Sequence, residues 1–298
     1  MSVPVALPAA LAYGVADFTG GLAARRAPVL VVTAAAQAAG LVSLVPVVWL
    51  VAGTPSAAAF GYGALAGIAG ASGLLLYLRA LAVGPMGVVA PLSAVVGAGL
   101  PLAVGLAGGE RLGPVTVLAI VVAMVAILLA TAGTRRDAAA STGLLLGLGA
   151  GVGFGLFFVG LDATPSGSGL WPLLAGRVVS VSLLTALVLR HRLPLRFGAR
   201  QGVREPVAPA APVAAPEAAR RSSPTLLMVV SGVLDTAANV LFLLAARLGD
   251  LGVTAVVVSL YPVVVVLLAR LLLGERLTRM QLTSAALALV ASALLAAG

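Results

Sequence analysis

Runs of about twenty apolar residues follow one another along almost the whole chain, and charge is confined mostly to the short segments between them. Hydrophobic residues make up 61% of the 298 residues and charged residues only 9%, whereas about a quarter of the residues in a typical soluble domain are charged. A soluble fold could not bury this much apolar surface. The pattern therefore excludes a soluble protein and predicts one whose solvent is lipid.

A helix needs about 20 apolar residues to cross the hydrocarbon layer of a membrane. When apolar runs of about this length are taken as spans, the sequence predicts an all-α membrane protein with ten transmembrane helices. Most of the connections are short and carry Gly, Pro or charge. The predicted spans cover residues 3–21, 29–52, 58–82, 87–107, 114–133, 143–161, 170–189, 225–246, 252–272 and 280–297.

Composition also excludes several kinds of partner. The formal net charge of +9 is compatible with nucleic-acid binding, but no basic stripe alternates with aromatic residues, so no nucleic-acid partner is expected. The chain has no Cys, which excludes disulfides and thiolate metal sites. Its one His, His191, lies between two Arg residues in a predicted loop and is expected to be solvated. We therefore expect no cofactor and no metal.

One connection differs from the others. Residues 190–224 carry seven Arg residues and a Pro/Ala run between Pro206 and Pro216. Such a low-complexity segment predicts disorder. We interpret it as an insertion that acts as a solvated tether, with regulation or contact with lipid headgroups as the alternative.

The second half of the chain repeats the first. With a constant offset of 165, Tyr77–Gly133 aligns with Phe242–Gly298, and the four residues Gly109–Leu112 are identical to Gly274–Leu277. Nearer the start of each half the offset is 140 or 141. There Tyr13-Gly14 aligns with Phe154-Gly155, and Gln37 aligns with Arg177. The tether lies between these two blocks and accounts for the change of offset.

The alignment predicts two repeats of five helices each, residues 1–137 and 138–298. Because five is odd, the second repeat enters the membrane from the opposite face, which makes the repeats inverted. Inverted repeats allow alternating access, in which a site near the middle of the membrane opens first to one side and then to the other.

These motifs resemble those of the EamA family within the drug/metabolite transporter superfamily. The resemblance rests on Gly87–Leu92 followed by Gly109–Leu112, and on Tyr261-Pro262 followed by Gly274–Leu277. It implies a ten-helix bundle with a central cavity between the halves, and the export or exchange of amino acids or other small metabolites. The chain departs from the family pattern at Gln37, where a basic residue is common.

Polar residues inside predicted spans are the candidates for substrate binding or coupling, because a charge at the centre of the bilayer costs about 2.5–3.5 kcal/mol. Asp235 lies near the middle of the eighth span, and Asn239 lies one turn further on the same face. They either line the cavity or form a bond between helices. Arg177 suits a substrate carboxylate; the alternatives are a structural pair with Asp235 or a side chain that reaches the interface.

Asp17 and Gln37 complete the set of candidates. Asp17 is either a proton site or an interfacial charge near the Arg25-Arg26 pair, and Gln37 is a possible cavity residue. Glu110 and Glu275 stand beside Arg at helix ends in both repeats, so we interpret them as structural. The glycines of residues 143–155 lack the strand and the acidic partner of a nucleotide site, and we interpret their spacing as close helix packing.

The predicted function is secondary transport of a small metabolite across the plasma membrane by alternating access, with possible proton coupling and no enzymatic activity. A lipid-linked flippase is an alternative within transport, and an intramembrane enzyme or a scaffold is an alternative outside it. The excess of Arg in odd-numbered loops places those loops in the cytoplasm and both termini outside, whereas the family resemblance implies both termini inside. A reporter that is active on one side of the membrane, fused to each terminus, distinguishes the two orientations.

Overall fold

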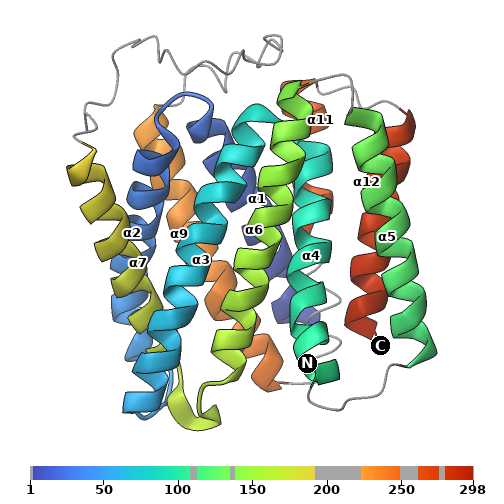
Figure 1. Ribbon diagram of the computed structural model, residues 1–298. Coiled ribbons are helices and arrows are strands. Elements are labelled where there is room, and N and C mark those ends of the chain that lie inside the picture. Colours follow the sequence, from blue (N-terminus) through green and yellow to red (C-terminus); the bar gives the residue numbers. More distant parts are fainter. Residues whose placement is uncertain are drawn as a thin grey trace.

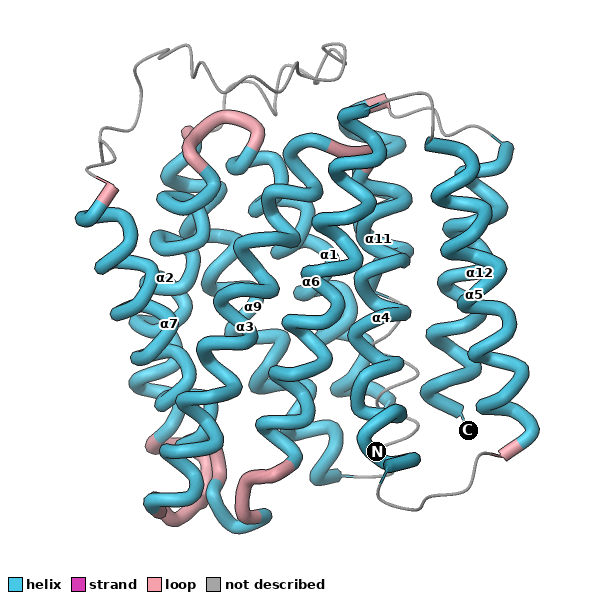
Figure 2. The backbone as a smooth tube through the Cα atoms, viewed as in Figure 1, coloured by secondary structure: helices cyan, strands magenta, loops and turns pink. Residues whose placement is uncertain are grey.

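In a computed structural model, the protein is a bundle of α-helices that run up and down beside one another (Figure 1). The structure describes residues 3–107, 113–134, 138–191, 223–248, 261–274 and 279–297. Figure 2 shows helices joined by short loops, and there is no strand among the described residues. The prediction of an all-α fold is confirmed for this part of the chain. The helices are α1 (Val3–Ala24), α2 (Val29–Val48), α3 (Ala57–Val83), α4 (Met86–Ala107), α5 (Pro114–Thr134), α6 (Ala138–Asp162), α7 (Trp171–Arg190), α9 (Pro224–Leu248), α11 (Tyr261–Leu273) and α12 (Arg279–Ala297).

Every apolar segment that was predicted as a span overlaps one of these helices. The largest differences are at α6, which begins at Ala138 rather than at 143, and at α2, which ends at Val48 rather than at 52. After α2 the chain turns at Trp49, whose ring packs edge-on against that of Trp171 with the centroids 5.4 Å apart. Residues 249–260, which include the predicted start of the ninth span, lie outside the described residues.

The surface of the bundle has the character of a membrane protein. Large apolar side chains are exposed on several helices, among them Val42 on α2, Leu65 on α3 and Leu145 on α6. Among the described residues, five helices are long and apolar enough to cross a membrane. The protein is therefore a multi-pass membrane protein. The five are Val29–Val48, Ala57–Val83, Ser141–Leu161, Trp171–Arg190 and Pro224–Ala245.

Helices α1 and α3 each pack against several other helices. Helix α1 contacts α2, α3, α9 and α11, whereas α3 contacts α6 and α7 as well as α1. The main core cluster fills the space between them and includes Phe18, Tyr77, Leu78, Leu81 and Met86. The start of α1 and the end of α12 lie at the same end of the bundle (Figure 1).

Glycines on α6 allow two neighbouring helices to approach closely, which confirms the packing interpretation of this run. A Cβ atom on Gly151 would lie 2.7 Å from the carbonyl oxygen of Ser93 on α4, and one on Gly153 would lie 2.6 Å from the Cα atom of Gly73 on α3. Gly147 and Gly155 also face α4, so α6 carries one glycine stripe toward α4 and another toward α3. The residues Gly109–Leu112 and 275–277 of the repeated motifs and residues 192–222 of the predicted tether lie outside the described residues.

Candidate site between helices α2, α7 and α9

Arg177 is a buried cation in the second turn of α7, and its side chain is only 10% exposed. Its Nη1 atom donates a hydrogen bond to Oε1 of Gln37 on α2. Its Nη2 atom donates to Oδ2 of Asp235 on α9, with which it forms an ion pair. Arg177 therefore joins three helices, and the structure brings together three of the residues selected from the sequence.

Asp235 and Asn239 share one face of α9, as their spacing predicts. The Asn239 side-chain amide donates to the backbone oxygen of Asp235 at 2.7 Å and approaches its Oδ2 atom at 3.4 Å. The Asp235 side chain is 23% exposed. Its Oδ2 atom is thus approached by both Arg177 and Asn239, so this carboxylate has a cation and a polar neighbour.

Small residues make room for the guanidinium group. A Cβ atom on Gly40 of α2 would lie 3.4 Å from Cζ of Arg177 and 2.6 Å from Oγ1 of Thr236 on α9. At the same crossing, Gly232 of α9 lies against the backbone of Ala36. The hydroxyl group of Thr236 is buried and forms no hydrogen bond with any described residue. The α2–α9 crossing therefore places a free polar group beside the ion pair.

Asp17 does not join this group of residues. Its Oδ2 atom accepts a hydrogen bond of 2.9 Å from the hydroxyl group of Tyr77 on α3, a residue that is fully buried. Asp235 nevertheless lies within electrostatic range of Asp17. The rings of Tyr13 on α1 and Tyr261 on α11 lie nearby, with their centroids 6.0 Å apart. The arrangement places Asp17 close to the cluster without a direct contact.

The sequence did not single out Tyr77 or Thr236. Tyr77 is one aromatic residue within an apolar helix, and only its contact with Asp17 distinguishes it. Thr236 follows Asp235 directly, but a single Thr in an apolar helix does not by itself indicate a functional site. Among the described residues, no group of three His, Cys, Asp or Glu side chains could hold a metal ion.

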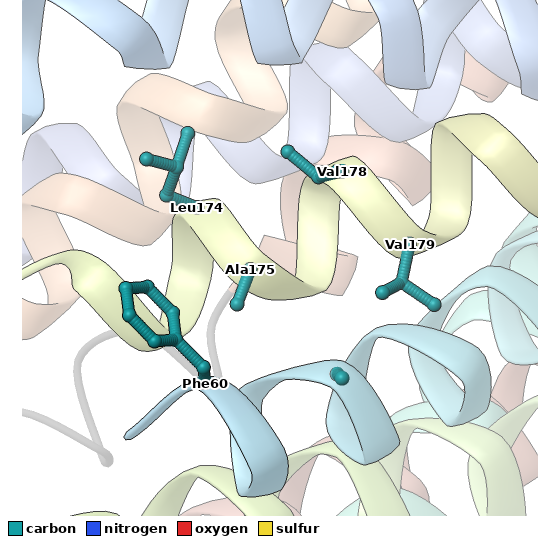
Figure 3. A pocket seen from close by; sticks show the side chains of 6 residues that line it. Phe60, Leu174, Ala175, Val178 and Val179 are labelled. Atoms are coloured by element: carbon teal, nitrogen blue, oxygen red, sulfur yellow. The ribbon is translucent and has the colours of Figure 1, made fainter. Parts of the chain in front are cut away.

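An apolar groove lies on another side of α7. It has a volume of about 340 Å³ and opens between α3 and α7 (Figure 3). No side chain that lines it carries a charge or a hydrogen-bonding group, so it does not suit a polar metabolite. The lining residues are Phe60, Ala64, Leu174, Ala175, Val178 and Val179.

Comparison with known proteins connects this arrangement to a family. Residues 141–297 match the model of the EamA-like transporter family. No curated protein matches the sequence. Eight chains of solved structures match the fold. One of them, described only as a crystal structure of a protein, has a TM-score of 0.58 and 16% identity, over 98% of this chain and 96% of that one. At this identity the likeness shows a shared fold.

Proposed function

The chain belongs to the EamA-like transporter family, and from this premise we propose that it moves a small metabolite across the plasma membrane by alternating access, as an exporter or an exchanger. The observation that carries the proposal is the ion pair between Arg177 and Asp235, which is enclosed by α2, α7 and α9. Charges inside a membrane protein are costly, and they commonly mark the path of a substrate or an ion.

We further propose that residues 1–137 and 138–298 are the two inverted repeats of ten transmembrane helices. The packing supports this, because the contacts of α3 with α6 and α7 have counterparts in the contacts of α9 with α1 and α2. The family match, residues 141–297, covers nearly the whole of the second repeat.

Single residues support the same correspondence. Gly67 of α3 lies against the backbone of Gly176 on α7, and Gly232 of α9 lies against the backbone of Ala36 on α2. Position 67 plus the offset of 165 gives 232, and position 36 plus the offset of 140 gives 176. Both offsets are those of the sequence alignment. The two close helix crossings are therefore equivalent positions of the proposed repeats.

The proposed substrate site lies where the two repeats meet. Gln37 belongs to the first repeat, and Arg177, Asp235 and Asn239 belong to the second. A guanidinium group binds a carboxylate or a phosphate through two parallel hydrogen bonds. A substrate anion would take the place of Asp235 or Gln37 on Arg177. Because those partners come from different helices, exchanging them would change how α2, α7 and α9 are held together, as alternating access requires.

Metabolite profiling of cells with and without the protein, followed by uptake of the accumulating or depleted compound into proteoliposomes, tests the proposal. We expect Arg177→Gln to reduce uptake at least tenfold and Asp235→Asn to reduce it as well. Arg79→Gln is the matched control, because Arg79 is exposed on α3, and it should transport at the wild-type rate. Uptake that is equal in wild type and Arg177→Gln would remove the proposed site, and no difference in any metabolite would count against transport itself.

A further inference from the structure

Among the charged side chains that the structure describes within helices, those that are not exposed carry more negative than positive charge; Arg25 and Arg26, which follow α1, are also partly buried. Of the charged side chains that the structure describes within helices, only Asp17, Arg177 and Asp235 are not exposed. Two acids and one base leave one uncompensated negative charge when all three are ionised. Arg177 is in contact with Asp235, whereas no described cation forms an ion pair with Asp17; its hydrogen-bond partner is Tyr77.

The contacts of Asp17 leave one of its oxygens available. Oδ2 accepts a hydrogen bond from Tyr77, and no described residue donates to Oδ1. The helices that pack on α1 bring other titratable groups near this carboxylate. Helix α9 contributes Asp235, α11 contributes Tyr261 and α3 contributes Tyr77, whereas α2 contains no titratable residue. Tyr13 lies one turn earlier on α1 itself, and none of these groups is a cation.

The equivalent place in the second proposed repeat shows that the fold does not need a carboxylate here. Adding 141 to 17 gives Phe158, and adding 165 to 77 gives Phe242. These two rings also meet, with their centroids 6.4 Å apart. The equivalent pair of positions is thus occupied by two apolar rings that meet in one repeat, and by Asp17 and Tyr77 in the other. Because an acid within a span is costly, its presence in only one repeat favours a functional role.

We propose that Asp17 is the proton-binding site of this protein and that Asp235 serves as the permanent counter-ion of Arg177. A proton from water binds Oδ1 of Asp17 and converts the carboxylate to a carboxylic acid, while Tyr77 continues to donate to Oδ2. Release returns the proton to water and restores the carboxylate. Binding of the proton brings the net charge of the three buried groups from minus one to zero.

This site deepens the proposed function, on which its physiological use rests. Asp17 and Asp235 are within electrostatic range of each other. A substrate anion that occupies Arg177 leaves Asp235 less neutralised, which makes the region more negative and favours a proton on Asp17. Transport and proton binding would therefore be coupled by charge, without a direct contact between substrate and Asp17.

Infrared difference spectroscopy of the purified protein in lipid vesicles, between about pH 4 and pH 10, tests the site without a substrate. We expect wild type to show a reversible C=O stretching band of a buried carboxylic acid. The band should be lost in Asp17→Asn and kept in Asp235→Asn. Tyr77→Phe should move it to higher wavenumber because the carbonyl loses a hydrogen bond, whereas Tyr62→Phe, which alters an exposed ring on α3, should leave it in place.

A band that persists in Asp17→Asn, a band that disappears in Asp235→Asn, or the absence of any such band in wild type would each overturn the assignment. Asn can still accept the Tyr77 hydrogen bond, and Tyr77→Phe gives a second measurement if Asp17→Asn does not fold. The readout is independent of transport. A band on Asp17 in a protein that moves no metabolite would contradict only the proposed function, and transport by a protein without the band would contradict only the proton site.

Discussion

Replacing Arg177 by Met tests how strongly the buried ion pair holds α2, α7 and α9 together. Met keeps an unbranched, flexible side chain that is shorter than that of Arg and has neither a charge nor a hydrogen-bond donor. In Arg177→Met, Asp235 loses its cation and Gln37 loses the donor to its Oε1 atom. The variant therefore leaves a carboxylate, 23% exposed in the wild type, without a positive partner.

The expected loss of stability follows from the charge that remains. Removing one partner of a buried ion pair costs about 3–5 kcal/mol. Since the Asp235 side chain is partly exposed, we expect about 3 kcal/mol for Arg177→Met. The double variant Arg177→Met/Asp235→Asn contains neither charge and should lose only about 1 kcal/mol.

Reversible unfolding in mixed micelles, followed by the fluorescence of Trp49 and Trp171, measures these free energies. Asp235→Asn alone should also cost about 3 kcal/mol, because it leaves the guanidinium without a carboxylate. Arg79→Met alters an exposed Arg and should change stability by less than about 0.5 kcal/mol. If the loss in the double variant equals the sum of the two single losses, the two residues are not coupled, and the ion pair does not support the fold as reasoned here.

Two further predictions concern helix packing and use the same unfolding measurement. Gly232→Ala should lose about 2 kcal/mol of unfolding free energy, because the new Cβ would overlap the backbone of Ala36 and separate α2 from α9. The control is Gly61→Ala, whose new Cβ would meet no atom within 4 Å. Equal stability of the two variants would contradict the close crossing. Ser93→Ala should lose about 1 kcal/mol, because it removes a buried hydrogen bond of 2.8 Å to the backbone of α6. The exposed Ser72→Ala should lose less, and the reverse order would refute that reasoning.

The positions of the helices could be predicted from the sequence because one physical quantity, the thickness of the hydrocarbon layer, sets the length of every apolar run. Helix ends were less predictable where the helix continues past that layer. At α6, the residues Ala138–Thr142 are small or polar and were not counted as part of the span, yet they extend the helix. Length and hydropathy measure the span within lipid, whereas the end of a helix depends on the local turn.

Part of the candidate site was predictable from spacing alone. Asp235 and Asn239 are four residues apart, so helical geometry places them on one face. Pairing of Arg177 with Asp235 was one of the open alternatives, and the structure contains it. The contact of Arg177 with Gln37 was not predicted, although the two residues are equivalent at an offset of 140. Equivalent residues of two related repeats touch only near the axis that relates them, and a sequence does not show where that axis passes.

The contact between Asp17 and Tyr77 was beyond prediction for a different reason. The two residues are 60 positions apart, and neither the hydropathy of α3 nor its length distinguishes a Tyr that faces a carboxylate from one that faces lipid. Their equivalents, Phe158 and Phe242, are both apolar. The internal alignment therefore could not mark this pair as a polar contact.

The proposed repeats duplicate packing but not charge, and this difference separates what the fold needs from what transport needs. The glycine crossing at Gly67 has its equivalent at Gly232. By contrast, Asp17, Arg177 and Asp235 align with Phe158, Gln37 and Gly70, none of which is charged. If stability required these charges, both repeats would be expected to carry them, since both build the same helix crossings. A single set of charges beside the interface of two similar halves is instead what one substrate site, opened in turn by either half, would require.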